Sequence, residues 1–247
     1  MNIRTFVNIN ISVNNIRTNN IRTSVNMETF VNKGKSENIE SRGPKSKEQA
    51  IMEAAEELFL EMGYNQATTT LIAKRAGVTH AMLHYYFRTK EHVFMKVLEK
   101  ILGELMQSFR PVMSRDEPFW ETLEKGISTH FDFLAKHPRF VPLLYDTMIH
   151  NPELIDRMKE NFLPVMERVF RFHVGRIQEE IANGRICRID PVQLMADIVT
   201  LNLSAFLLMP VAGRLTGVAP DALDNPFLEA RKAEIIALVR YRLYGKL

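Results

Sequence analysis

Apolar residues recur at helical spacing along nearly all of the chain that follows residue 45. Ser46 and Gln49 match a capping box before the first apolar run, and no segment shows the alternation of a β-strand bounded by turns. Gly184 closes the longest run, and three helix starts place an Asx residue before a proline at the first helical position. The pattern therefore predicts an all-α protein with about nine or ten helices. The three marked starts are Asn151-Pro152, Asp190-Pro191 and Asn225-Pro226.

Two short helices joined by a tight glycine turn follow the first apolar run. Thr68 can cap the first of them, and Gly77 can end it because glycine adopts the left-handed conformation without a steric penalty. Thr79 can cap the second, in which Leu83 and Phe87 lie four residues apart and face inward. This spacing predicts a helix-turn-helix, an arrangement that places one helix in the major groove of DNA.

The outward side of the second short helix carries side chains with no obvious core to fill. They are His80, Met82, His84 and Tyr85. Thr89 can cap a third helix, and Lys90 stands in its first turn. Exposed backbone N–H groups at a helix start, with a lysine beside them, form an anion site. The pattern therefore indicates contacts with a phosphate backbone.

The run from Gly63 to His92 resembles the DNA-binding region of the TetR family of bacterial transcriptional regulators. The resemblance extends from Ser46 to about Leu98, and it includes the preceding amphipathic helix and a Tyr-Phe-x-x-Lys-Glu ending. It implies a homodimer, most commonly a repressor, that binds a near-palindromic operator and releases it when a small molecule enters a C-terminal helical domain. It also implies base contacts from Thr79, His80, Met82 and His84, and phosphate contacts from Thr68, Thr70, Tyr85 and Lys90.

The chain departs from the family at the start of the second short helix. Many members carry a small residue, then lysine, glycine and threonine, where this chain has residues 79–82, and many have tyrosine where His84 stands. The fold is expected to be the same, because Leu83, Tyr86 and Phe87 hold the packing positions. The base preference is expected to differ, because Met82 offers only apolar contact, best matched to a thymine methyl group.

Residues 1–44 read as a disordered, low-complexity tail rich in asparagine. The sequence Asn-Ile-Arg-Thr begins at residues 2, 15 and 20, which suggests translation of repeated upstream DNA. One hypothesis is therefore that synthesis begins at Met27. The alternative is a basic arm, because residues 1–47 carry a net charge of +5, with any DNA contact confined to Lys33 through Lys47.

We divide the remainder into a DNA-binding domain at residues 45–94 and an effector-binding and dimerisation domain at residues 95–247. Two helices of the second domain, at about 191–210 and 226–244, carry more apolar surface than one small domain needs. The family resemblance implies that they form a four-helix bundle with a second copy, and the alternative is an ordinary core. The apolar faces consist of Leu194, Ile198, Leu201 and Ala205 on the first helix, and of Ile235, Leu238, Val239 and Leu243 on the second.

Aromatic and methionine side chains are concentrated between Phe109 and Phe172, which suits an adaptable apolar cavity. Few unpaired charges fall on those helix faces, so we expect a small hydrophobic effector. Most of these side chains are expected to lie in the core. The candidates for ligand contact are large apolar side chains that also carry a polar group, or that lie in the middle of a helix. They are Trp120, His130, Tyr145 and Phe162.

The sequence predicts no catalytic, metal or cofactor site. His80 and His84 have the spacing of zinc ligands, but no cysteine or acidic residue stands beside them to complete a site. No phosphate loop, dinucleotide fingerprint or positioned pair of base and nucleophile is found, so no enzyme is expected. There is no secretory signal and no apolar run of about 18 residues, and the single cysteine, Cys187, fits a reducing cytoplasm.

Two other functions stay open at this point. One is an architectural DNA-binding protein of the same fold that takes no effector. The other is a small-molecule-binding protein whose DNA binding has lapsed. Loss of DNA binding when an effector is added would distinguish a repressor from both.

Overall fold

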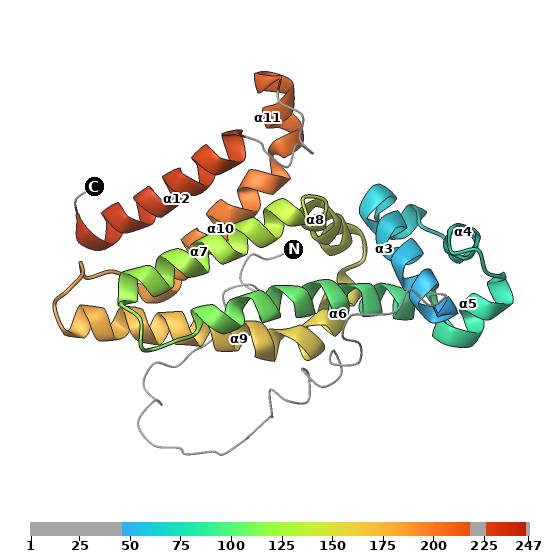
Figure 1. Ribbon diagram of the computed structural model, residues 1–247, viewed down its shortest axis with the longest axis horizontal. Coiled ribbons are helices and arrows are strands. Elements are labelled where there is room, and N and C mark those ends of the chain that lie inside the picture. Colours follow the sequence, from blue (N-terminus) through green and yellow to red (C-terminus); the bar gives the residue numbers. More distant parts are fainter. Residues whose placement is uncertain (1–45, 218–225, 246–247) are drawn as a thin grey trace, which may run out of the picture. The chain divides into compact units, whose positions relative to one another are not determined.

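The computed structural model describes residues 46–217 and 226–245, except for the side chains of residues 159–165, 210, 212 and 216. This part of the chain contains ten α-helices, one short 3-10 helix and no strand (Figure 1), which confirms the all-α prediction. The predicted tail at residues 1–44, the hypothesis of a start at Met27 and the cap at Asn225 all lie outside the described residues.

The helix-turn-helix forms as predicted, because each of its helices begins at a side chain that bonds the backbone three residues ahead. The helices are α3 (Lys47–Gln66), α4 (Thr69–Arg75) and α5 (His80–Phe87), followed by α6 (Lys90–Phe109). The hydroxyls of Ser46, Thr68, Thr79 and Thr89 accept hydrogen bonds from the N–H groups of Gln49, Leu71, Met82 and His92. Gly77, at a φ of 66°, makes the turn between α4 and α5.

A shared core joins the helix-turn-helix to α6. Leu83 and Phe87 are buried, as predicted, and the ring of Phe94 on α6 packs between two rings at the end of α3. Its centroid lies 5.0 Å from that of Phe59 and 4.8 Å from that of Tyr64. The predicted domain boundary at residue 95 falls inside α6, so this helix is common to both predicted domains.

The remaining helices pack around α10, which contacts α7, α8, α9 and α12. Figure 1 also shows α6 running beside α9, with which it is in contact. The elements are η2 (Arg110–Val112), α7 (Phe119–Lys136), α8 (Phe140–His150), α9 (Pro152–Ala182), α10 (Pro191–Leu207), α11 (Met209–Thr216) and α12 (Pro226–Tyr244).

Only one of the two described Asx-Pro starts uses its side chain as a cap. The carboxylate of Asp190 accepts hydrogen bonds from the N–H groups of Val192 and Gln193, as predicted. Asn151 occupies the cap position of α9 but forms no side-chain cap bond, and its amide nitrogen is buried without a partner in the described part of the chain. The predicted side-chain cap at Asn151 is therefore wrong.

The apolar face that the sequence assigned to a dimer partner on α10 is largely used by the chain's own core. Because α10 packs among four other helices, Leu194, Ile198 and Ala205 are buried and Leu201 is partly buried. On α12 the assignment holds only for Leu238, which is 44% exposed. Ile235, Val239 and Leu243 are buried within the chain. The apolar side chains left exposed on α10, α11 and α12 are Val192, Leu207, Leu208, Val211, Leu215, Phe227, Leu238, Tyr241 and Tyr244.

Candidate nucleic-acid interface

The helix α5 has one buried and one exposed face. Leu83 and Phe87 anchor it in the core, whereas Tyr85 is 81% exposed and both histidines, His80 and His84, are also exposed. The fourth predicted contact of this helix, Met82, is partly buried, and its sulfur lies 3.9 Å from the Nζ atom of Lys47. The structure thus leaves a polar and aromatic surface of α5 open to a partner.

Contacts between side chains fix the position of this surface relative to α4. The Nε2 atom of His80 lies 3.0 Å from the hydroxyl of Thr69 in the first turn of α4. The rings of His80 and His84 meet edge to face, with their centroids 4.4 Å apart. The predicted phosphate contacts Thr68 and Thr70, at the start of α4, are both exposed.

The turn between α5 and α6 is held by two histidines. Arg88 has a φ of 59°, a left-handed conformation that non-glycine residues rarely adopt. Its carbonyl oxygen accepts a hydrogen bond of 2.7 Å from Nδ1 of His84, and its N–H group donates to the carbonyl of His84 at 3.0 Å. The Nδ1 atom of His92 donates to the carbonyl of Phe87 at 3.0 Å. These bonds stabilise the strained turn.

Lys90 is bonded within the chain as well as placed at the start of α6. Its ammonium group donates to the carbonyls of Tyr64 at 3.0 Å and Asn65 at 3.4 Å, and it lies 4.2 Å from the centroid of the Tyr64 ring. Burial lowers the pKa of Lys90 below its ordinary value. The lysine therefore ties α6 to the end of α3, and its phosphate contact stays a prediction.

Two more side chains lie beside this surface, and one of them, Lys47, is the last residue of the basic arm considered in the sequence analysis. Tyr86, which was assigned to a packing position, is exposed, and its ring meets that of Tyr85 edge to face at 5.3 Å. Lys47 in the first turn of α3 reaches the recognition helix at Met82. Spacing gives no signal for the exposure of Tyr86, because a residue three positions after Leu83 lies on the same side of the helix.

The comparisons with known proteins agree with this geometry. The sequence model described as "Bacterial regulatory proteins, tetR family" matches residues 51–97. The transcriptional repressor BepR of Brucella suis is 38% identical over 168 residues, which span 64% of this chain and 78% of that protein. The chain belongs to the tetR family. It is therefore a tetR-family transcriptional regulator with its helix-turn-helix at α4 and α5.

Two further proteins are similar to this tetR-family chain. The nucleoid occlusion factor SlmA of Haemophilus influenzae is 25% identical over 185 residues, covering 73% of this chain and 83% of that protein. The solved structure of FadR from Bacillus subtilis in complex with stearoyl-CoA shares the fold, with a TM-score of 0.58 at 21% identity. That match covers 77% of this chain and 96% of FadR.

Three of the four predicted effector contacts of this tetR-family protein have described side chains, and these three lie in different surroundings. Trp120 packs against the Tyr244 ring at 6.1 Å and beneath the Arg240 guanidinium at 5.3 Å. Tyr145 is exposed on α8, and the side chain of Phe162 is not among those described. His130 alone meets a polar partner inside the helical bundle. The prediction did not account for which helix covers each face.

His130 belongs to a set of buried polar side chains between α7, α9 and α10. The amide nitrogen of Asn202 donates to the carbonyl of Ile127 at 3.2 Å and lies 3.1 Å from Nδ1 of His130. The Oδ1 atom of Asn202 and the Nε2 atom of His173 are buried without a partner in the described residues. The position of a Cβ on Gly126 would lie 3.2 Å from the His173 ring. The one sequence signal for this set is Asn202, a polar residue inside an apolar run.

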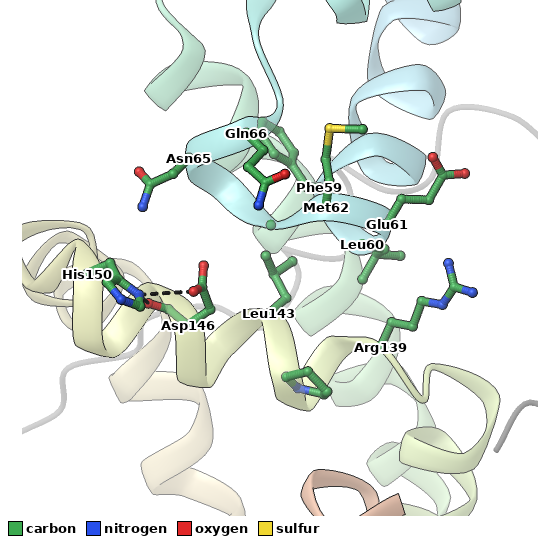
Figure 2. A pocket seen from close by; sticks show the side chains of 12 residues that line it. Phe59, Leu60, Glu61, Met62, Asn65, Gln66, Arg139, Leu143, Asp146 and His150 are labelled. Atoms are coloured by element: carbon green, nitrogen blue, oxygen red, sulfur yellow. Dashed lines mark hydrogen bonds and ion pairs between the residues drawn. The ribbon is translucent and has the colours of Figure 1, made fainter. Parts of the chain in front are cut away.

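A separate groove of about 550 Å³ lies between the end of α3 and α8 (Figure 2). Figure 2 shows the ion pair of Asp146 and His150, 2.9 Å long, at one end of the groove and Glu61 with Arg139 at the other. A second groove, of about 580 Å³, follows the surface of α7. Neither groove is lined by a predicted effector residue.

The described residues support neither a metal site nor a membrane helix. No three histidine, cysteine, aspartate or glutamate side chains within residues 46–217 and 226–245 are placed to hold a metal ion. In the same ranges, no helix combines the length and the apolar character that a membrane span requires.

The stability of the protein is expected to fall as the pH drops from about 6.5 to about 4. Burial lowers the pKa of His130 and of His173 from 6.5 to about 4, so in this range the unfolded chain binds protons that the folded chain does not. Each histidine then contributes a loss on the order of 3 kcal/mol in the free energy of unfolding. Denaturant unfolding across this range should show a shallower pH dependence for His173→Phe than for the wild type. Identical pH profiles would contradict the assignment to His173.

Proposed function

We propose that the protein is a repressor that binds a palindromic DNA operator as a homodimer and releases it when a small hydrophobic effector binds. The observation that carries the proposal is the outer face of α5, where polar and aromatic side chains stay exposed on a helix anchored by Leu83 and Phe87. A helix in this position of a helix-turn-helix enters the major groove. The similarity to BepR, which is named a repressor, supports repression as the sign of regulation.

The exposed groups divide by chemistry into base and phosphate contacts. Phosphate oxygens only accept hydrogen bonds, so the hydroxyl of Tyr85 and the ammonium of Lys90 suit them. We assign phosphate contacts also to the exposed hydroxyls of Thr68 and Thr70 at the start of α4. Base contacts come from the outer face of α5. We assign them to Thr79, His80, Met82 and His84.

The full chain should select a palindrome from a pool of random DNA, with half-sites centred about 10 base pairs apart. That spacing follows if two copies present α5 to successive turns of the major groove. Recovery of no preferred sequence would favour an architectural role, for which the similarity to the nucleoid occlusion factor SlmA is the specific observation. Absence of any DNA binding would favour a ligand-binding protein that has lost its operator.

Substitutions at Lys90 and Met82 are expected to act differently on the selected operator. Lys90→Ala should weaken binding to all sequences and reduce the slope of log affinity against log salt by about 1, because a phosphate contact is lost. Met82→Ala should change the base preference at one position per half-site and leave the salt dependence unaltered. The measurement is fluorescence anisotropy of labelled operators at several salt concentrations.

The control for this pair is Lys96→Ala, which removes an exposed lysine of α6 that pairs with Glu99 at 2.6 Å. It should leave affinity and salt slope unchanged. Because Lys90 also bonds the end of α3, the helix content of each variant is checked by circular dichroism. An unchanged salt slope in folded Lys90→Ala would contradict its phosphate contact.

The exposed side of α12 supports the dimer. Ion pairs of Lys232 with Asp132, at 2.9 Å, and of Arg242 with Asp197 join α12 to α7 and α10 of its own chain. A neighbouring face of the same helix presents Leu238 together with Phe227 and Tyr241, which share that face. The helix α11 also exposes Val211 and Leu215, and exposed apolar side chains that gather in one patch mark protein interfaces. A second copy would cover these side chains by two-fold symmetry.

Leu238→Asp should turn the dimer into a monomer at concentrations where the wild type is dimeric. A carboxylate in the centre of an apolar interface loses its solvation without gaining a partner, so the dissociation constant should rise at least about 10-fold. Sedimentation equilibrium measures the change. Ile149→Asp, at a position 54% exposed on α8, is the matched control and should stay dimeric. Dimers of equal strength in both variants would place the interface elsewhere.

The effector is proposed to bind within the bundle of α7, α9 and α10. Unpartnered buried polar atoms cost about 1–3 kcal/mol each, so Asn202 and His173 favour a ligand that hydrogen-bonds them within apolar surroundings. FadR, which shares the fold, was solved with stearoyl-CoA, an acyl chain that carries polar groups at one end. Fatty acyl thioesters are therefore the first compounds to try.

Stearoyl-CoA added to the preformed operator complex is expected to release the DNA. A ligand has this effect only if it binds the DNA-free state of the protein more tightly than the DNA-bound state. Release should need a higher concentration for Asn202→Leu, which removes the Oδ1 atom that has no partner among the described residues and leaves an apolar side chain of similar size. If stearoyl-CoA leaves binding unchanged in both proteins, acyl thioesters are excluded as effectors of this protein.

A further inference from the structure

The turn that follows α5 holds the imidazole of His84 by a hydrogen bond to one of its two ring nitrogens. Its Nδ1 atom lies 2.7 Å from the carbonyl oxygen of Arg88, and the N–H group of Arg88 donates back to the carbonyl of His84 at 3.0 Å. Arg88 has a positive φ of 59°, and its carbonyl is within hydrogen-bond distance of the ring. These two reciprocal bonds, together with the edge-to-face contact with His80, fix the orientation of the imidazole.

The bond to a carbonyl determines where the proton of the ring resides. A carbonyl oxygen only accepts hydrogen bonds, so the Nδ1 atom of His84 must donate. A neutral imidazole carries a single N–H group, and Nε2 is then an acceptor with a free lone pair. Within residues 46–217 and 226–245, His84 forms no side-chain hydrogen bond other than the one to Arg88. The Nε2 atom of this exposed residue can therefore accept a hydrogen bond from a donor on a partner.

We propose that His84 is a specificity-determining residue that reads an exocyclic amino group in the major groove. The major-groove edge of adenine offers a donor at N6 and that of cytosine at N4, whereas guanine offers only acceptors and thymine an acceptor and a methyl group. Phosphate oxygens are also acceptors only, so the neutral ring does not suit a backbone contact. The inference rests on the proposed operator binding and assigns the class of base that one position of α5 recognises.

The other histidines near α5 do not carry the same constraint. The Nε2 atom of His80 faces the hydroxyl of Thr69, which both donates and accepts, so its tautomer is not fixed by that contact. His92 also donates from Nδ1 to a carbonyl, that of Phe87, but it belongs to α6 and its ring meets the Phe87 ring at 5.9 Å. His92 therefore provides a matched control for loss of a histidine that stabilises the same turn.

The first test compares the sequences that the full-length wild type, His84→Leu and His92→Leu select from random DNA at pH 8. Wild type should select adenine or cytosine at one position in each half-site. His84→Leu should lose the preference at that position and keep the remainder of the palindrome. His92→Leu should keep the wild-type preference throughout.

The second test removes the amino group from the base instead of the side chain from the protein. The selected adenine is replaced by unsubstituted purine, or the selected cytosine by pyrimidin-2-one, in a labelled operator. Wild type should bind this operator about 10-fold more weakly, as expected for loss of one base contact. The affinity of His84→Leu should not depend on the amino group of the base, because leucine cannot accept a hydrogen bond from it. Any change should reflect only the apolar contact of the leucine with the base. The base analogue also pairs with the opposite strand at a different strength. This effect is the same for both proteins, because they bind the same DNA, and it cancels when their changes in affinity are compared.

Three outcomes would overturn the inference while leaving the proposed function intact. The first is a palindrome that His84→Leu selects unchanged, and the second is guanine or thymine at the position that responds to His84. The third is a uniform loss of affinity for all sequences in His84→Leu, which would indicate a phosphate contact by a charged ring. Failure of the wild type to select any sequence would instead contradict the proposed function itself.

Discussion

The placement of the recognition helix depends on the contact between the end of α3 and the start of α6. The Phe94 ring packs against Phe59 and Tyr64 there, and Lys90 donates to the Tyr64 carbonyl from above the ring. The two helices between them, α4 and α5, have only seven and eight residues, and helices of this length are unstable alone in water. Their orientation is therefore set by the long helices on either side.

The long helices α3 and α6 also connect the helix-turn-helix to the helices that follow α6. The backbone of α3 bends at Gly63, with a φ of 78°, and a Cβ at that position would lie 3.1 Å from the carboxylate of Asp146 on α8. The positive φ therefore favours glycine, and a side chain at this position would also have to displace the Asp146 carboxylate slightly. On the other side, α6 packs against α7 and α9, and Arg157 forms an ion pair with Glu91. A displacement of α8 or α9 would act directly on the helices that orient α5.

Local features of this fold could be predicted from the sequence, and features that depend on distant helices could not. The threonine caps of α4, α5 and α6 bond within three residues, so neighbouring sequence suffices to identify them. The buried face of α10 was misassigned because its four covering helices come from distant parts of the chain. Trp120 looked like a ligand contact, yet it is covered by Tyr244 and Arg240 from α12. The spacing of apolar residues in α7 carries no information on which residues of α12 contact Trp120.

The histidines show why a residue type alone does not determine a role. His84 donates from Nδ1 to a carbonyl, whereas Nδ1 of His130 faces the amide N–H of Asn202 and must accept, so the two rings hold their protons on different nitrogens. Each partner is fixed by the backbone of another residue or by another helix. At the position of His84, the resembling family often carries tyrosine, whose hydroxyl can donate. A ring held as an acceptor at the same place favours a different set of base edges without any change in the fold.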